Sequence, residues 1–331
     1  MKIIEEDRLH IRDTASKLGL SNKTFLITGA TGMIGKNVVM SLTGITKEEN
    51  IIVLGKDYEE AANVFAGHNF VISSFDLISN LNLKVDYIIH LASPTNSSFL
   101  NSCPVETIDF MYFSTKKMLD FAKGHQSKMV YVSSMEVFGQ VFDEKKREEH
   151  ELGLIDLENT RSSYSETKRL CELLCSCYAK EFGIDVMSAR LSQTFGAGTS
   201  LEDPRIFGYL ARCAKNKENI ILKTKGESVG NYCYLSDTIE ALLYILTKGQ
   251  KGFVYNVVGD DNRSTIFDMA TMVASQIANG SIDVVINVDP NNPYPSPTLL
   301  NMSNKRLKAL GWTPRYSLID MYKRMLDSFE E

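Results

Sequence analysis

The 331-residue sequence predicts an α/β protein with a doubly wound parallel sheet and a smaller C-terminal lobe. Short, continuous apolar runs alternate with helical patterns along the first two thirds of the chain, as in parallel sheets covered on both faces. A glycine-rich turn lies between the first apolar run and the first helical pattern. Hydrophobic residues make up 44% of the chain, which is enough for a substantial core.

The first strand and the turn after it have a dinucleotide-binding pattern. Residues 24–28 are apolar and β-branched, which indicates a buried strand, and the apolar positions of 34–42 fit a helix. Glycines between them allow a tight turn, and phosphates can then lie against free N–H groups at the helix N-terminus. This order of strand, turn and helix predicts a Rossmann dinucleotide site. Its predicted contacts are Gly29, Thr31, Gly32, Met33, Ile34 and Gly35.

The remaining elements follow in alternation. Further strands are predicted at 51–54, 70–72, 87–90, 129–132 and 184–187. Helices are predicted between them at 59–65, 105–123 and 162–182, and later at 204–215, 236–246, 265–277 and 317–329. Ligands of such a sheet bind outside the carboxyl ends of its strands.

The pattern loosens after residue 192, where glycines and prolines become frequent. We expect a dinucleotide-binding Rossmann domain at 21–192, with 231–260 returning to it. Residues 193–230 and 261–331 are expected to form the substrate-binding lobe. Residues 1–20 are expected to be a helical extension packed on the surface, and their sequence indicates no function.

Tyr164 and Lys168 are the candidate catalytic pair. Both lie in residues 162–182, which contain no Pro or Gly, and residues four apart share a helix face. An ammonium group one turn from a phenol favours the phenolate, so we expect Lys168 to lower the pKa of Tyr164 toward the range of an acid/base catalyst. The same lysine could also reach a ribose hydroxyl of a bound dinucleotide.

Composition excludes several classes of protein. A net charge of -5 leaves no basic surface for nucleic acid. No apolar run approaches membrane-spanning length and residues 1–20 are not signal-like, so we expect a cytoplasmic protein. The six cysteines form no pair of C-x-x-C elements and no ligand spacing with the histidines, so we expect reduced thiols and no metal site.

These elements together resemble the extended branch of the short-chain dehydrogenase/reductase superfamily, the NAD-dependent nucleotide-sugar epimerases, dehydratases and decarboxylases. The resemblance covers about residues 23–314 and depends on eight elements that occur in the family's order. They lie at 28–35, 76–77, 90–93, 132–139, 164–168, 190–196, 231–237 and 310–312.

The resemblance implies a role for each matching residue. Tyr164 would take a sugar hydroxyl proton as hydride leaves, with Lys168 as its electrostatic partner, and Ser134 would hydrogen-bond the reacting oxygen. A serine that only caps the end of its strand is the alternative for Ser134. The other implied cofactor contacts are Asp76 and Leu77 beside the adenine and Ala92 and Ser93 on the nicotinamide side.

The second strand bears on the choice of cofactor. It is followed by Lys56 and Asp57, and an acidic residue there would pair with the ribose of NAD. Lys56 could instead favour the 2′-phosphate of NADP. Because the related enzymes return the hydride to the same sugar, we expect tightly held NAD, with NADP as the alternative.

Glu136 separates the branches of this family. The resemblance implies a small neutral residue there in 4-epimerases and Glu in dehydratases and decarboxylases. Dehydratases also carry an acid just before it, where this chain has Met135, and a thioether cannot donate a proton. Residues 161–164 and 168–169 also resemble the decarboxylase branch. A solvated Glu136 without a role is the alternative.

The presumed substrate contacts depart from the family. Gln193 stands where Asn commonly contacts the diphosphate, and Gly230 stands where many members have a phosphate-binding Arg. A diphosphate needs compensating cations, for which Arg205 and Lys223 are the candidates.

The sequence therefore favours transient C4 oxidation of a nucleotide sugar followed by uronate decarboxylase-like chemistry. A nucleotide-sugar 4-epimerase, an NADP-dependent reductase of a small carbonyl compound and a dinucleotide-binding regulator without catalysis remain as alternatives. The helices at 105–123 and 162–182 carry more apolar positions than one sheet face needs, and in similar proteins they pair across a two-fold axis, so we expect a homodimer.

Overall fold

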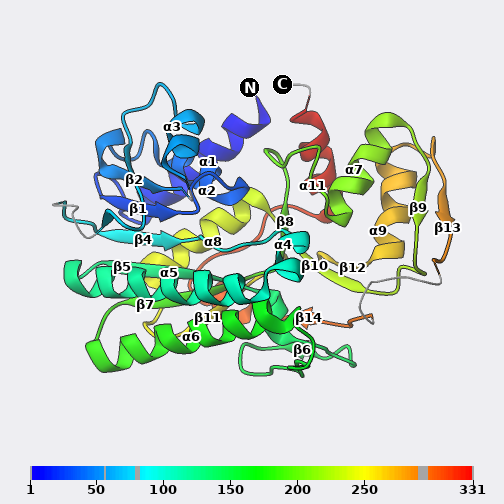
Figure 1. Cartoon of the computed structure of the whole chain (residues 1–331). Coiled ribbons are helices and arrows are strands. Elements are labelled where there is room, and N and C mark those ends of the chain that lie inside the picture. The colour runs from blue at the N-terminus through cyan, green and yellow to red at the C-terminus, as the bar shows by residue number, and fades with distance from the viewer. Residues whose placement is uncertain (1, 56, 79–82, 290–296, 330–331) are drawn as a thin grey trace.

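A seven-stranded, fully parallel sheet forms the centre of the computed structural model, which describes residues 2–55, 57–78, 83–289 and 297–329 (Figure 1). The strand order is β3-β2-β1-β4-β5-β7-β11, so the predicted doubly wound Rossmann sheet is confirmed. The strands are β1 (Phe25–Thr28), β2 (Ile51–Leu54), β3 (Val71–Ser73), β4 (Tyr87–His90), β5 (Lys128–Ser134), β7 (Val186–Leu191) and β11 (Val254–Val257).

Strand β7 lies further along the chain than the predicted 184–187. It continues through Ser188 and Arg190, polar residues that interrupt the apolar run yet are buried against the helical layer. Strand β11 pairs with β7 at the edge of the sheet. Residues 229–234 form β10 (Val229–Tyr234), which belongs to a separate three-stranded sheet with β8 (Gln193–Phe195) and β12 (Arg263–Thr265).

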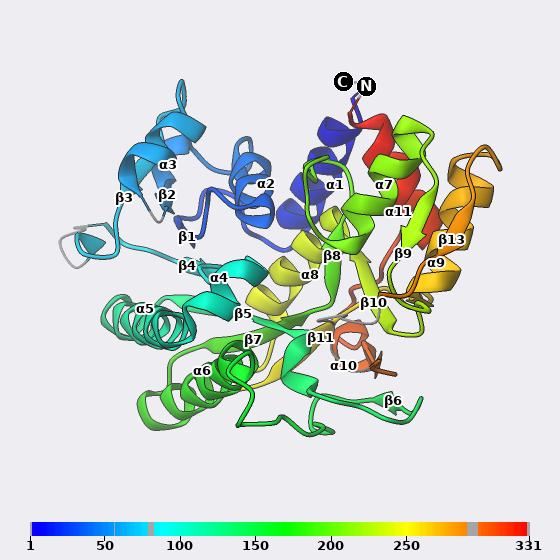
Figure 2. The same cartoon turned by 45° about the vertical axis from the view of Figure 1, so that its right-hand side comes forward.

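Helices cover both faces of the central sheet. α5 (Pro104–His125) and α6 (Ser162–Phe182) lie side by side on one face in both views, while α2 (Met33–Leu42) and α8 (Leu235–Lys248) cover the other (Figures 1 and 2). Alternate residues of β2 enter the two resulting cores, Ile51 and Val53 on one side and Ile52 and Leu54 on the other. No helix within the described residues is long and apolar enough to cross a bilayer.

The smaller lobe surrounds a core of its own, in which Phe195, Phe207 and Tyr232 pack together. Its helices are α7 (Ile206–Asn216), α9 (Ile266–Met272) with a π-helical turn at Val273–Ile277, and α11 (Leu318–Asp327). The remaining elements are α3 (Tyr58–Val64), α4 (Ser97–Ser102), α10 (Lys305–Lys308), the 3₁₀ turns Glu48–Asn50 and Met135–Phe138, and the strand pairs β9 (Ile220–Leu222) with β13 (Val284–Ile286) and β6 (Lys146–Arg147) with β14 (Asn301–Met302).

The N-terminal extension forms helix α1 (Ile3–Lys17), as predicted. It packs against α8 and α2, and one of its faces is buried through Asp7, Ile11 and Ala15. The spacing of these three residues places them on one side of the helix. The extension is therefore packed on the folded body along one face.

Candidate active site

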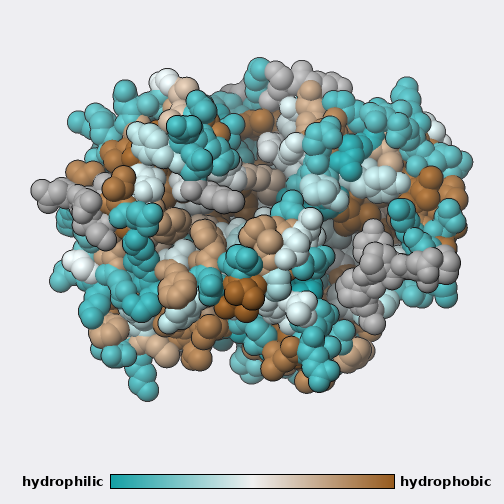
Figure 3. Space-filling view, in the orientation of Figure 1, coloured by the Kyte–Doolittle hydropathy of each residue, from teal (hydrophilic) through white to brown (hydrophobic). Residues whose placement is uncertain are grey.

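A cavity of about 790 Å³ opens at the carboxyl ends of the central strands, between the sheet and the smaller lobe. Figure 3 shows this face of the molecule hollowed near its middle. The cavity collects side chains and backbone from the glycine turn, from the segments after β4 and β5, from the start of α6 and from the smaller lobe. The predicted site residues that line it are Gly29, Thr31, Gly32, Met33, Ile34, Gly35, Ala92, Ser93, Ser134, Glu136, Tyr164, Lys168, Gln193 and Arg205.

The turn between β1 and α2 has the close packing that a pyrophosphate cradle requires. Gly29 has a φ of +64°, and a Cβ there would lie 2.9 Å from the backbone nitrogen of Ala92. A Cβ on Gly35 would lie 2.2 Å from the carbonyl oxygen of Gly29. Gly32 is the N-cap of α2, whose N-terminus points its N–H groups toward the cavity. The chain thus fits a dinucleotide at this turn.

Gly35→Ala is expected to abolish dinucleotide binding, because the added methyl group cannot fit without moving the backbone of the turn. Binding is measured by calorimetric titration of the purified variant with NAD. Gly124→Ala in α5 is the control, since a Cβ there meets no atom within 4 Å. A Gly35→Ala protein that binds NAD as tightly as the parent would contradict the assignment.

A buried histidine supports the segment after β4. His90 Nδ1 lies 2.7 Å from Thr28 Oγ1, and His90 Nε2 lies 3.1 Å from Thr115 Oγ1. Burial lowers the pKa of His90 to about 3, so the ring is neutral. The Thr28 hydroxyl also accepts a hydrogen bond from the backbone N–H of Ala92 at 3.0 Å. These contacts hold Ala92, which lines the cavity, at a fixed place.

The structure corrects the expected pKa of Tyr164. Burial raises the pKa of this phenol above its usual value, and the negative charge of Glu136 raises it further. Hydrogen bonding with Ser134 and Ser93 and the positive charge of Arg161 act in the opposite direction without outweighing burial. The prediction that the pKa of Tyr164 is lowered was wrong because it neglected the loss of solvation of a buried phenol.

Lys168 is buried between the backbone of β5 and the ring of Tyr164. Its Nζ donates to the carbonyl oxygen of Val132 at 2.8 Å and lies 5.6 Å from the centre of the Tyr164 ring. Burial lowers the pKa of Lys168 to about 8. The ammonium group is therefore held in place by β5, within reach of the phenol.

The pKa of Lys168 predicts a change of stability with pH. Between about pH 8 and pH 10.5 the unfolded chain keeps this proton while the folded chain has lost it, so the free energy of unfolding rises with pH in that window. Relative to Lys168→Met, the parent is expected to gain on the order of 3 kcal/mol across the whole window. Urea unfolding of both proteins without dinucleotide from pH 7 to 11 measures this difference. A constant difference would show that Lys168 is not desolvated.

Glu136 is paired within the cavity. It lies in the 3₁₀ turn after β5, and its carboxylate oxygens lie 3.1 and 3.2 Å from Nη2 of Arg161, the N-cap residue of α6. The hydroxyl of Ser165 donates to the same carboxylate at 3.4 Å. Ser134 accepts a hydrogen bond from the backbone of Glu136, so its strand-end capping role is present in addition to its position beside Tyr164.

Arg161 is a site residue that the sequence reasoning did not identify individually. It lines the cavity, and its guanidinium carbon lies 5.5 Å from the centre of the Tyr164 ring. Its position directly before the predicted helix 162–182, three residues from Tyr164, was an available signal. Arg205 also lines the cavity, where it pairs with Asp203 at 2.6 Å.

Among the described residues, four predicted contacts lie outside the cavity lining. The Asp57 carboxylate accepts hydrogen bonds from the backbone of Glu59 and Glu60 and so caps α3. The side chain of Asp76 is 98% exposed, 3.7 Å from Lys117, and Leu77 beside it is also exposed. Lys223 follows β9 on the surface of the smaller lobe. Ligand roles for these residues stay predictions, and Lys56 lies outside the described residues.

A parallel Rossmann sheet with a glycine cradle beside a Tyr/Lys pair defines a class of dinucleotide-dependent enzymes. The chain belongs to the NAD dependent epimerase/dehydratase family, whose sequence profile matches residues 25–258. The predicted family is therefore confirmed, and with it the dependence on a nicotinamide dinucleotide.

Relatives and solved structures agree with this membership. The chain is 28% identical over 319 residues to UDP-glucuronic acid decarboxylase 6 of Arabidopsis thaliana, covering 95% of this chain and 91% of the relative. Its fold is similar to that of dTDP-glucose 4,6-dehydratase from Bacillus anthracis in complex with NAD, with a TM-score of 0.74, 19% identity and coverage of 93% and 96%. It is also similar to UDP-glucose 4-epimerase from Thermotoga maritima with UDP-glucose, with a TM-score of 0.77, 18% identity and coverage of 93% and 98%.

Proposed function

We propose that this protein is an NAD-dependent nucleotide-sugar decarboxylase that acts on a nucleoside-diphosphate uronate. The observation that carries the proposal is the Glu136–Arg161 pair, which lies in the same cavity as Tyr164. The similarity to UDP-glucuronic acid decarboxylases over 95% of the chain supports the same choice.

The chain's own residues supply the proton transfers and the orientation. Tyr164 accepts the proton of the C4 hydroxyl, and Ser134 hydrogen-bonds the same oxygen as it becomes a carbonyl. Lys168 stabilises the phenolate that this transfer requires. NAD would be held by the glycine turn and by the segment after β4, and when bound it would supply the acceptor for the C4 hydride.

The loss of carbon dioxide follows from the position of the new carbonyl. The carboxylate at C6 is attached to C5, next to the C4 ketone, so the substrate is a β-keto acid. The C5–C6 bond breaks and C6 leaves as carbon dioxide, the electron pair of that bond becomes the C4–C5 enolate, and a proton from solvent water at C5 restores the ketone. Arg161 provides the cation that an acidic sugar needs in this cavity, and Glu136 keeps that cation oriented.

Incubation with UDP-glucuronate labelled at C6 tests the proposal. Release of labelled carbon dioxide and formation of a pentose nucleotide, read by mass spectrometry and NMR, are expected. An unchanged mass with inverted C4 would instead identify an epimerase. Net conversion of the free dinucleotide with a small carbonyl compound would identify a reductase, and tight dinucleotide binding without turnover of any nucleotide sugar would identify a regulator.

Glu136→Gln sharpens this experiment. Loss of the carboxylate leaves Arg161 without its partner, so carbon dioxide release is expected to fall more than oxidation at C4, and reduced dinucleotide should accumulate. Glu106→Gln is the matched control, because Glu106 also lines the cavity, from the first turn of α5. Equal effects of the two variants would remove the special role of Glu136.

We also propose NAD in preference to NADP, because the proposed cycle returns the hydride to the same sugar and needs no pool of reduced cofactor. Titration with both dinucleotides tests this, and tighter binding of NADP would overturn it.

A homodimer is proposed on the apolar side chains that α5 and α6 expose. Sedimentation at the chain mass of 37.1 kDa would contradict the dimer. These side chains are Val105, Ile108, Phe113, Leu170, Leu173 and Phe182.

A further inference from the structure

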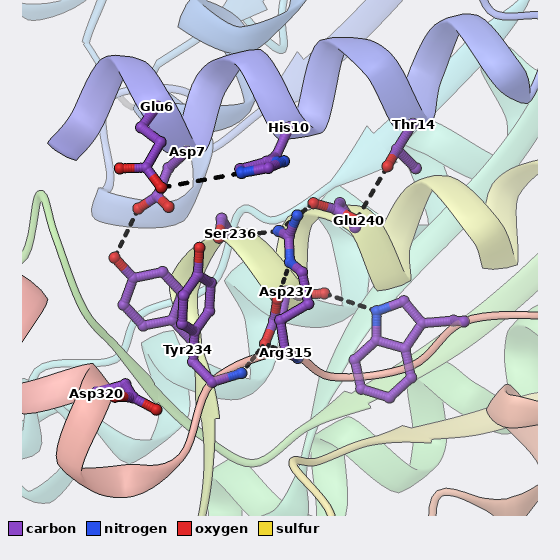
Figure 4. Close-up of polar contacts among 12 residues, drawn as sticks. Glu6, Asp7, His10, Thr14, Tyr234, Ser236, Asp237, Glu240, Arg315 and Asp320 are labelled. Atoms are coloured by element: carbon purple, nitrogen blue, oxygen red, sulfur yellow. Dashed lines mark hydrogen bonds and ion pairs between the residues drawn. The ribbon is translucent and has the colours of Figure 1, made fainter. Parts of the chain in front are cut away.

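Arg12 of helix α1 donates hydrogen bonds to the C-terminal end of α2. Two further polar contacts, here called the first and the second anchor, join α1 to other parts of the molecule (Figure 4). At the first, the hydroxyl of Tyr234 donates to Asp7 Oδ2 at 2.6 Å, and Arg324 Nη2 donates to Asp7 Oδ1 at 2.8 Å. At the second, two turns along the helix, Thr14 Oγ1 donates to Glu240 at 3.0 Å. Asp7 is only 6% exposed, so its contacts are made out of water.

Tyr234 connects the first anchor to the segment after β8, residues 196–199, which we call the 196–199 loop. Its hydroxyl accepts a hydrogen bond from the backbone N–H of Ala197 at 3.3 Å and another from Arg324 Nε at 3.1 Å. Its ring lies directly against Gly196, where a Cβ would approach to within 2.3 Å of a ring carbon. The phenol of Tyr234 therefore holds the 196–199 loop in place, and Asp7 in turn holds the phenol.

The 196–199 loop in turn contacts the dinucleotide turn. The hydroxyl of Thr199 accepts from the backbone N–H of Gly196 at 2.9 Å and donates to Met33 Sδ at 3.4 Å. Gly198 packs against Asn37, whose amide donates to the Met33 carbonyl oxygen at 2.9 Å. Met33 is the first residue of α2 and lines the cavity. A continuous chain of contacts thus runs from the N-terminal helix to the N-terminus of the dinucleotide-binding helix.

We propose that Asp7 is a positioning residue for dinucleotide binding, acting through Tyr234 and the 196–199 loop. It holds this loop against the first turn of α2, so that the N–H groups there keep the orientation a pyrophosphate needs. The N-terminal helix thereby sets the affinity for the dinucleotide without touching it. This role does not depend on which nucleotide sugar the enzyme uses.

Asp7→Asn in the full chain tests the proposal. The amide cannot neutralise Arg324, and it weakens the hydrogen bond from Tyr234. The dissociation constant for NAD, from calorimetry, is expected to rise about tenfold, while the turnover rate at saturating NAD stays within about twofold of the parent. Tyr234→Phe removes only the hydroxyl that links Asp7 to Ala197 and is expected to show the same split.

Two matched variants of the same helix separate positioning from general stabilisation. Thr14→Ala removes the second anchor and is expected to lower the melting temperature while leaving the dissociation constant unchanged. Asp13→Asn removes an exposed pair with Lys17 and is expected to change neither. The proposal is overturned if Tyr234→Phe binds NAD as the parent does, or if Thr14→Ala weakens NAD binding as much as Asp7→Asn. If Asp7→Asn does not fold, the comparison of Tyr234→Phe with Thr14→Ala decides alone.

Discussion

Tyr164→Phe is expected to lower the turnover rate roughly 100- to 10,000-fold while dinucleotide binding persists. The phenol is the group to which the proposed mechanism assigns both the acceptance and the return of the hydroxyl proton at the reacting carbon. Removing its oxygen leaves the buried ring in place, since Tyr164 packs against Leu100 and Met111. Steady-state rates with the substrate proposed above, together with NAD titration of the same protein, measure the two effects separately.

Tyr178→Phe provides the control for this experiment. Tyr178 lies on the same helix, and its hydroxyl donates to Asp120 at 2.7 Å, away from the cavity. The Tyr178→Phe protein also lacks one phenol oxygen, but its turnover rate is expected to change little. If the Tyr164→Phe enzyme turned over normally, another group would have to move the proton, and the assignment of this cavity as the reaction centre would be wrong.

The site was predictable from the sequence where local spacing determines geometry. The glycine turn and the Tyr164/Lys168 pair each depend on residues within one turn of chain, and the structure brings both into one cavity. Because the carboxyl ends of β1, β4 and β5 meet at one edge, the segments that follow them could be expected to converge there.

Properties that depend on tertiary contacts were not predictable in this way. The pKa of Tyr164 depends on how completely the cavity excludes water, which spacing along a helix does not show. The Glu136–Arg161 pair joins a 3₁₀ turn after β5 to the N-cap of α6. The sequence does not distinguish Asp7 from the other charges of the N-terminal extension, because its burial and its contacts with Tyr234 and Arg324 are tertiary.

Strand β7 shows the same limit in the hydrophobic pattern. Arg190 lies beyond the predicted strand 184–187, yet its side chain is 4% exposed and accounts for two hydrogen bonds to Glu172 of α6, at 2.9 and 2.7 Å. A charged residue can occupy a buried strand when a partner on the neighbouring helix neutralises it. A hydrophobic pattern read from the sequence would predict that such a charged residue is exposed.

Glu172→Gln is expected to lower the free energy of unfolding by about 3–5 kcal/mol, because it leaves the buried guanidinium of Arg190 without a counter-charge. The pair does more than join α6 to β7. Arg190 Nη1 also donates to the carbonyl oxygen of Glu149 at 2.6 Å, and Glu149 accepts from the backbone N–H of Asn256 in β11 at 3.0 Å. Loss of one charge therefore loosens the helix that carries Tyr164 and the edge of the sheet together. Urea unfolding at pH 7 measures the effect.

Two further variants show whether the charge imbalance is the cause. Glu166→Gln removes a partly exposed carboxylate from the same helix, where it pairs with Arg169, and should cost no more than about 1 kcal/mol. Combining Glu172→Leu with Arg190→Met removes both buried charges, and because no unpaired ion remains, this protein is expected to recover much of the stability that Glu172→Gln loses. A double variant as unstable as Glu172→Gln would show instead that the hydrogen bond from Arg190 to Glu149, and not charge neutralisation, holds this part of the site together.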